Sequence, residues 1–143
     1  MAVDSGMKIR YAELEDVPAV LDFWLLAAEG TDRRDSPDKV VALIERDPEA
    51  LLLAELDGQL IGTLIAGWDG WRAHLYRLAV HPSHRRKGIA TTLLAEAEAR
   101  FTALGAFRAD AMVLDANVSA QGAWSAAGYT PQPIWSRWVK PLK

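Results

Sequence analysis

The segment Leu78–Ala90 contains the residues whose types and spacing are best suited to chemistry. An apolar run ends there, a basic loop follows, and a helical pattern begins at two small residues. In chain order these parts are Leu78-Ala79-Val80, the cations Arg85-Arg86-Lys87, and Gly88-Ile89-Ala90. A helix N-terminus leaves backbone N–H groups unpaired and carries partial positive charge, so it suits phosphate groups. The segment therefore predicts a site for a small phosphorylated ligand, and glycine lets the backbone approach it closely.

The alternative for this segment is a solvated basic loop that caps an ordinary helix. The pattern R-x-x-G-x-A is short, and alone it would favour that alternative. The other phosphate-binding patterns, G-x-x-x-x-G-K-[ST] and G-x-G-x-x-G, are absent. The surrounding elements therefore have to decide between the two interpretations.

Hydrophobic periodicity predicts a mixed α/β fold around this segment. The turn signals Asp57-Gly58 and Asp69-Gly70 join three consecutive strands into an antiparallel meander. Strands are expected over residues 7–14, 50–56, 59–68, 71–80, 107–114 and 134–139. Helices are expected over residues 16–30, 36–47, 88–104 and 118–127.

Two motifs at consistent spacing make the chain resemble the GNAT superfamily of N-acetyltransferases. Arg85, Gly88 and Ala90 match its motif A, [Q/R]-x-x-G-x-[G/A], and Asn117 with Gly128-Tyr129 resembles its motif B. The resemblance implies one acyl-CoA N-acyltransferase domain over residues 1–143. Its fold would be α/β (α+β), with a mixed, largely antiparallel sheet, a splayed central pair of strands, and helices on both faces.

The resemblance also implies how acetyl-CoA, the co-substrate, would bind. The backbone N–H of Leu78 would bond the thioester carbonyl as an oxyanion-type donor, and Val80 would bond the pantetheine amides. The segment 86–91 would surround the pyrophosphate, and Asn117 would contact the pantetheine arm or a water. The cofactor-binding residues expected on this basis are Leu78, Ala79, Val80, Arg85, Arg86, Lys87, Gly88, Ile89, Ala90, Thr91, Asn117 and Trp124.

The acid and base groups of many family members are missing. The position of the usual tyrosine acid is occupied by Trp124, and Met112 and Val113 stand where some members carry a glutamate. A third location, on the fourth strand, contains His74, and histidine has a pKa near 6.5 that suits a general base. Regular alternation puts His74, Tyr76 and Leu78 on one side of the strand, unless a bulge near Leu78 breaks that parity. The alternative is a histidine that faces solvent.

Acceptor specificity in this family comes from the first helices, the turn between the third and fourth strands, and the C-terminus. Tryptophan beside carboxylates suits a cationic amine, and six tryptophans is a large number for 143 residues. The substrate-binding candidates are Trp24, Glu29, Trp68, Asp69 and Trp71. Core packing is favoured for Trp24 and Trp138, and an exposed tryptophan would equally suit a homodimer interface.

Composition excludes several other classes of protein. A net charge of -3 is unlike a general nucleic-acid binder, and three scattered histidines predict no metal site. No membrane span or apolar signal core is visible, and cysteine is absent, which together favour a cytoplasmic protein. The sequence thus predicts a transferase that moves an acetyl group from acetyl-CoA to a primary amine of a small molecule or peptide, by direct attack in a ternary complex. The alternative is a non-catalytic acyl-CoA-binding or sensing module.

Overall fold

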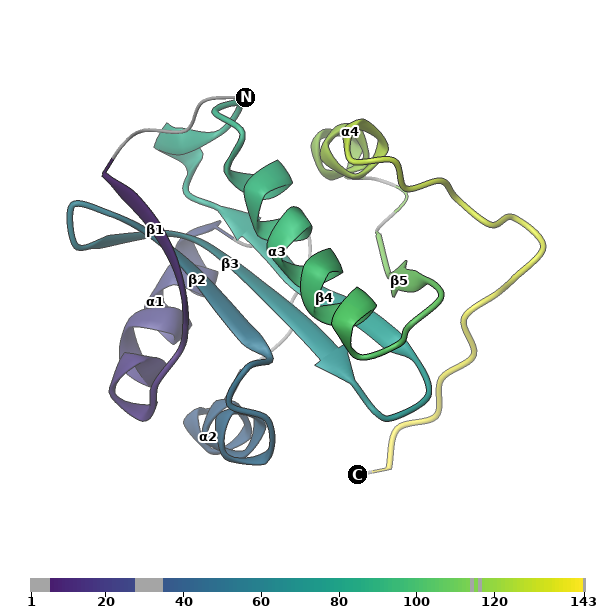
Figure 1. Ribbon diagram of the computed structural model, residues 1–143, viewed down its shortest axis with the longest axis horizontal. Helices are drawn as coiled ribbons and strands as arrows, with labels where there is room; N and C mark the ends of the chain where they lie inside the picture. The colour runs from purple at the N-terminus through teal and green to yellow at the C-terminus, as the bar shows by residue number, and fades with distance from the viewer. Residues whose placement is uncertain (1–5, 28–34, 114, 116, 143) are drawn as a thin grey trace.

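Five strands form one sheet in the computed structural model, which describes residues 6–27, 35–113, 115 and 117–142 (Figure 1). The sheet order is β1-β2-β3-β4-β5; the first four strands are antiparallel, and β5 is parallel to β4. The strands are β1 (Met7–Tyr11), β2 (Leu51–Leu56), β3 (Gln59–Trp68), β4 (Ala73–Val80) and β5 (Ala109–Ala111). The helices are α1 (Val17–Ala27), α2 (Pro37–Arg46), α3 (Ile89–Ala103) and α4 (Val118–Ala126).

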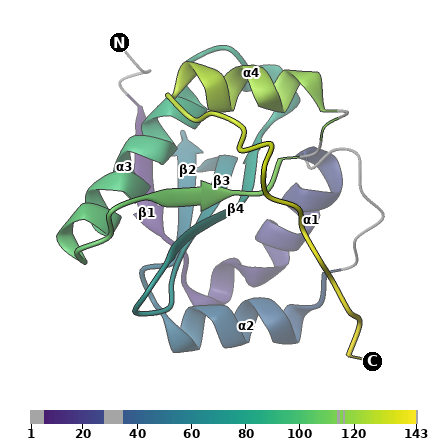
Figure 2. The ribbon, with the colours of Figure 1, turned by 90° about the vertical axis from the view of Figure 1, so that its right-hand side faces the viewer.

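The helices cover both faces of the sheet, as the predicted fold class requires (Figure 2). Strand β2 shows why, since its apolar run alternates between two buried clusters. Leu51 and Leu53 pack with α1 and α2 in what we name the α1/α2 cluster, which also contains Trp24. Leu52 and Ala54 pack with α3 and α4 in what we name the α3/α4 cluster. The sheet is therefore buried on both faces, and the fold class is confirmed.

Local signals in the sequence account for several element ends. Ser36 caps α2 by accepting a hydrogen bond from the Lys39 N–H, and Pro37 occupies the first turn of that helix. Asp57 and Gly58 both have positive φ, at 51° and 79°, which is the backbone of a two-residue hairpin turn. None of the helices that the structure describes combines the length and hydropathy that a bilayer crossing needs.

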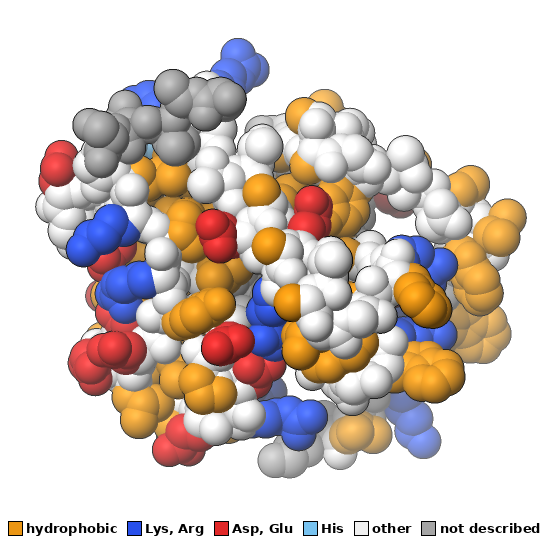
Figure 3. Space-filling model, viewed as in Figure 1, with side chains coloured by type: hydrophobic (Ala, Val, Ile, Leu, Met, Phe, Trp, Pro, Cys, Tyr) orange, Lys and Arg blue, Asp and Glu red, His pale blue; other side chains and the backbone are white. Residues whose placement is uncertain are grey.

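The C-terminal segment corrects two expectations. Residues 134–139 form no strand, and β5 spans Ala109–Ala111, whereas a strand was predicted over 107–114, of which residue 114 lies outside the described residues. The first result has a physical reason, because β5 has only three residues and so offers few backbone partners to a further strand. Trp138 is 91% exposed, so core packing is wrong for it. Apolar side chains gather along the edge of the molecule where this tail runs (Figure 3).

Arg10 ties three segments together at the edge of the sheet. Its guanidinium donates two hydrogen bonds of 2.7 Å to the carboxylate of Asp16 and one of 2.9 Å to Glu55. These hydrogen bonds are the main cause that lowers the pKa of both carboxyl groups below the ordinary range. Asp16 therefore ends the short turn before α1 and binds Arg10, whereas α1 itself begins at Val17.

We expect Arg10→Met to lower the free energy of unfolding at pH 7 by about 1 kcal/mol, the upper end for partly exposed ion pairs. Because the carboxyl pKa values are lowered on folding, this stabilisation is present above about pH 4 and is lost as the pH falls through the folded values. Urea unfolding at pH 7 and pH 3 measures it, with Arg46→Met at the exposed end of α2 as control. A difference that stays constant between the two pH values would contradict the expectation.

Candidate active site

A bulge interrupts β4 near its C-terminal end. Ile65 of β3 pairs with Tyr76, but the next aligned pair is Thr63 with Ala79, and the register shifts between them. Two residues of β4, Arg77 and Leu78, therefore lie opposite a single residue of β3. Arg77 has a φ of 56°, in the left-handed region that non-glycine residues rarely adopt.

The bulge changes which face of the sheet each β4 side chain reaches. Before it, Leu75 lies in the α3/α4 cluster, so His74 and Tyr76 point to the opposite face. After it, Ala79 lies in the α1/α2 cluster, and Leu78 packs against the α3/α4 cluster. The expectation that His74 shares a side with Leu78 is thus wrong, for the reason that the sequence analysis allowed.

Strands β4 and β5 separate beside the bulge. Their parallel pairing covers Ala73–Leu75 of β4 only, and in the described ranges the rest of β4 has no β5 partner. The His81 N–H bonds the carbonyl of Ile61, on the β3 side. Since alternate residues of a strand direct their N–H groups to opposite sides, Val80 and Leu78 present theirs toward β5. The backbone of β4 thus offers donors where its neighbour has turned away.

The loop after β4 is held in shape by backbone contacts. Arg85 donates from Nε to the carbonyl of Val80 and from a terminal nitrogen to the carbonyl of Ala27, each at 3.2 Å. His81 accepts a hydrogen bond from the Ser83 N–H through Nδ1, at 3.0 Å. The Arg85 side chain thus links α1 to the loop, while the next two residues, Arg86 and Lys87, are exposed.

The start of α3 fits a pyrophosphate. Gly88 is its N-cap with a φ of 80°, and the first helical hydrogen bond runs from the Thr92 N–H to the Gly88 carbonyl, at 3.0 Å. Helix geometry leaves the N–H groups before Thr92 without intrahelical acceptors. The exposed cations Arg86 and Lys87 lie at this same helix end. Orphan donors, a partial positive charge and two cations form a suitable cradle for a diphosphate.

The β3–β4 hairpin brings Asp69 and His74 together. One oxygen of Asp69 accepts hydrogen bonds of 2.7 Å from the N–H groups of Trp71 and Arg72, which lowers the pKa of this carboxyl group. Its other oxygen lies 3.8 Å from Nε2 of His74. Trp71 is 83% exposed, so this turn presents a carboxylate, an imidazole and an indole at the surface.

Tyr76 is a candidate active-site residue that the sequence analysis did not propose. Its ring centroid lies 6.0 Å from that of His74, and 45% of the residue is exposed. Burial, and then the charge of Asp69, raise the pKa of its phenol. The signal that would have found Tyr76 is its place midway between His74 and Leu78, which are four residues, or about 13 Å, apart along the strand.

The remaining predicted residues are distributed over the core and the loops. Trp24 is buried in the α1/α2 cluster, and its indole N–H bonds Thr63 at 2.9 Å. Trp124 is 7% exposed and packs edge-on against Tyr129. Asn117 caps α4 by accepting from the Ala120 N–H, and Trp68 is half-buried. Glu29 lies outside the described residues.

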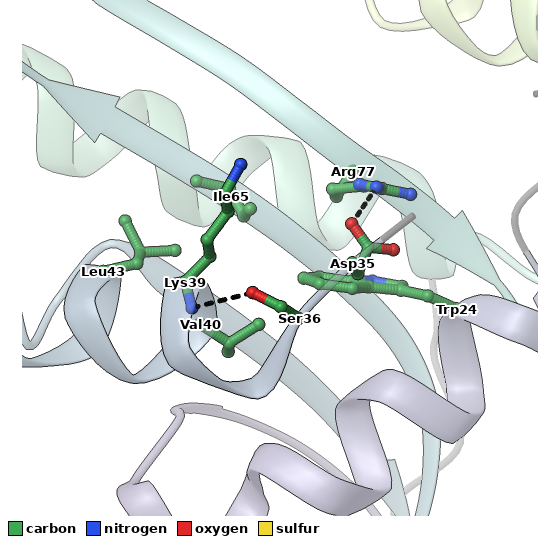
Figure 4. Close-up of a pocket in the computed structure, with 8 residues that line it drawn as sticks. All are labelled: Trp24, Asp35, Ser36, Lys39, Val40, Leu43, Ile65 and Arg77. Atoms are coloured by element: carbon green, nitrogen blue, oxygen red, sulfur yellow. Dashed lines mark hydrogen bonds and ion pairs between the residues drawn. The ribbon is translucent and has the colours of Figure 1, made fainter. Parts of the chain in front are cut away.

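A small pocket of about 130 Å³ opens on the α1/α2 side of the bulge (Figure 4). Inside it, Arg77 forms an ion pair with Asp35 above the ring of Trp24. The residues that line it are Trp24, Asp35, Ser36, Lys39, Val40, Leu43, Ile65 and Arg77. Its walls come from α1, α2, β3 and β4, so it borders the same stretch of backbone as the proposed thioester donor.

Comparison with known proteins places this geometry in a family. Residues 17–129 match the acetyltransferase (GNAT) family. An acetyltransferase of Pectobacterium atrosepticum is 30% identical over 123 residues, which cover 86% of this chain and 87% of that protein.

Two solved structures share the fold. The PaiA N-acetyltransferase of Thermoplasma acidophilum in complex with coenzyme A has a TM-score of 0.79 and 22% identity, and covers 88% of this chain and 91% of its own. YncA of Salmonella typhimurium, a putative acetyltransferase with acetyl-CoA, has a TM-score of 0.72 and 24% identity, covering 88% and 80%. The predicted enzyme class, an acetyl-CoA-dependent acetyltransferase, is confirmed, and the chain belongs to the acetyltransferase (GNAT) family.

Proposed function

We propose that this enzyme transfers the acetyl group of acetyl-CoA to a primary amine of a small molecule or peptide, by direct attack in a ternary complex. The observation that carries the proposal is the β4 bulge, which lies between a helix end suited to diphosphate and a strand edge that β5 has left. In the reaction, the amine nitrogen bonds the acetyl carbon as the carbon–sulfur bond breaks. The bound ammonium loses two protons, one before attack to give the neutral amine and one as the amide forms; the departing thiolate takes up one proton, and the other passes through the general base to solvent.

The proposed roles of the chain's own groups follow from their places. The N–H of Leu78 polarises the thioester carbonyl, as an oxyanion-type donor. The N–H groups of residues 89–91, with Arg86 and Lys87, hold the pyrophosphate. The Val80 N–H points toward the side that β5 has left, so it would bond the pantetheine arm. His74 is the proposed general base, acting through water because of its distance along β4 from Leu78.

The acceptor would bind at the β3–β4 hairpin. Asp69 has a lowered pKa and an exposed carboxylate, so it stays charged near neutral pH and attracts a protonated amine. The indoles of Trp68 and Trp71 flank it and would favour a cation by their π-faces. Trp24 is less accessible to a substrate, since its side chain is buried and hydrogen-bonded.

One observation favours a second candidate function, an acyl-CoA-binding module without turnover. The position of the usual tyrosine acid carries Trp124, whose indole cannot supply a proton at a useful pKa. Calorimetric titration with CoA, followed by a screen of primary amines for thiol release, separates the two functions. Because the chain has no cysteine, every thiol that the screen detects is CoA. CoA binding without thiol release from any amine would favour the second function.

We expect Trp124→Tyr to keep the fold and to preserve or raise the transfer rate, because a phenol at this position can protonate the thiolate. Trp124 is buried against Tyr129, so the smaller ring should cost about 1–2 kcal/mol of stability. Trp124→Phe is the matched control, since it has the same ring without the hydroxyl. Equal rates for the two variants, both below that of the parent, would place position 124 away from the sulfur.

We also propose that residues 1–143 act as one domain. A homodimer and a cytoplasmic location stay predictions. The exposed indoles of Trp71, Trp135 and Trp138 support the dimer, because large apolar side chains at a surface often mark an interface.

A further inference from the structure

Thr63 occupies an unusual place in the centre of the sheet. Among the residues that the structure describes, it is the one polar residue that is fully buried. Its hydroxyl accepts a hydrogen bond from the indole N–H of Trp24 at 2.9 Å, and donates one to the carbonyl of Arg77, also at 2.9 Å. One side chain of β3 thus connects α1 to the bulge of β4.

The bulge explains why this hydroxyl is needed. Two β4 residues oppose one β3 residue there, so the regular ladder does not supply a partner for every backbone group. A carbonyl shielded from water without a partner is costly, and the Thr63 hydroxyl donates to the partly buried carbonyl of Arg77. Trp24 fixes the orientation of the hydroxyl. The indole N–H can only donate, so the Thr63 oxygen accepts from it and the hydroxyl proton points at the carbonyl of Arg77.

The carbonyl of Arg77 and the N–H of Leu78 belong to the same peptide group. That group is planar and trans, so its C=O and N–H point in opposite directions. Holding the carbonyl toward Thr63, on the β3 and α1 side, therefore directs the Leu78 N–H away from β3. This is the direction that the alternation along β4 also gives it, toward the edge that β5 has left.

A second restraint acts on the same residue. The Arg77 guanidinium lies 4.9 Å from the centroid of the Trp24 ring and pairs with Asp35 (Figure 4). Trp24 thus contacts the bulge twice, through its ring to the Arg77 side chain and through its N–H to Thr63. Together these contacts hold Arg77 in its left-handed conformation.

We propose that Thr63, oriented by Trp24, is a positioning residue that fixes the Arg77–Leu78 peptide group so that the Leu78 N–H points at the thioester carbonyl. This inference rests on the proposed function, in which that N–H is the oxyanion-type donor. Thr63 touches neither substrate, and it acts only through the peptide group that it holds.

The test compares Thr63→Val, which removes both hydrogen bonds, with Thr63→Ser, which keeps the hydroxyl. With acetyl-CoA and the best amine of the screen, Thr63→Val should lower kcat about tenfold, a part of what losing an oxyanion donor costs. Thr63→Ser should restore kcat to within about threefold of the parent. The Kd of CoA should not change, because the loop at Arg86–Thr91 is untouched.

A comparison of ligands separates positioning from stability. The Leu78 N–H would contact only the acetyl carbonyl, so Thr63→Val should weaken acetyl-CoA binding and spare free CoA. A purely structural role would lower the melting temperature and leave the ratio of the two affinities unchanged. An unchanged ratio together with an unchanged kcat overturns the inference.

If Thr63→Val does not fold, Trp24→Phe takes its place, since it removes the indole N–H and keeps a ring beneath Arg77. It should lower kcat about threefold, because the Thr63 hydroxyl can then rotate and no longer always donates to the carbonyl of Arg77. A Trp24→Phe variant with the kcat of the parent then overturns the inference. If the parent chain binds no CoA or transfers no acetyl group, the proposed function fails and the inference fails with it. An active parent with fully active variants refutes the inference alone.

Discussion

Gly88→Val is expected to weaken CoA binding by roughly 100-fold or more, which is about 2.7 kcal/mol of binding free energy. Gly88 has a φ of 80°, and a β-branched side chain is strained there. A valine would also stand between the first turn of α3 and the pyrophosphate, and would keep the orphan N–H groups from reaching it. Calorimetric titration with CoA measures the effect, starting from an affinity of micromolar order in the parent.

Arg86→Glu tests the charge at the same cradle separately from its shape. The side chain of Arg86 is exposed, so the substitution should not disturb the core. We expect it to weaken CoA binding strongly and to weaken it less at high salt, because screening reduces both the attraction and the repulsion. Lys140→Glu, the same charge reversal on the exposed tail, is the control. Unchanged CoA titration curves for both Gly88→Val and Arg86→Glu would remove the basis for placing the pyrophosphate at this loop.

His74→Ala should lower kcat/KM by roughly 100-fold, the usual size for the loss of a general base. The Kd of CoA should barely change, because His74 lies on the strand before the loop. The pH–rate profile should also change its shape, because the group proposed to accept the proton is removed. Steady-state rates over a range of pH, with the best acceptor of the screen, measure both effects.

Asp69→Asn is the companion variant for His74→Ala. The asparagine keeps a side-chain oxygen for the N–H groups of Trp71 and Arg72, so the turn is retained, and only the charge beside His74 is lost. It should mainly raise the KM of a cationic amine. If His74→Ala keeps full activity with the same pH profile, the role assigned to His74 is wrong, and water or Asp69 must accept the proton.

The features that the sequence predicted well are those that neighbouring residues determine. Gly88 shows this, because a glycine after three cations and before an apolar helical stripe reveals a helix start without any distant contact. The same holds for the hairpin at Asp57-Gly58, where the two residues alone adopt the backbone that the turn needs. Such local signals were sufficient for the order of the elements from β1 to α4.

The predictions that failed concern features that depend on contacts between segments distant in the sequence. Residues 134–139 have the composition of a strand, but a strand also needs an edge to pair with, and β5 provides only three residues. Trp24 and Trp138 looked alike in the sequence, yet one lies in the core and the other in the exposed tail. A bulge near Leu78 was allowed for but not predicted to occur, because it arises from the register between β3 and β4.

The bulge also determines how this gene can change over evolutionary time. Because β4 has one extra residue, Leu75 packs in the α3/α4 cluster while Ala79 packs in the α1/α2 cluster. Deleting a single residue between Tyr76 and Ala79 would exchange the faces of everything that follows in the strand, since side chains alternate with a period of two. Substitutions along β4 alter one contact at a time, whereas a change of length moves all of them. Among diverging descendants of this sequence, gaps should therefore accumulate in the loops and be purged from β4.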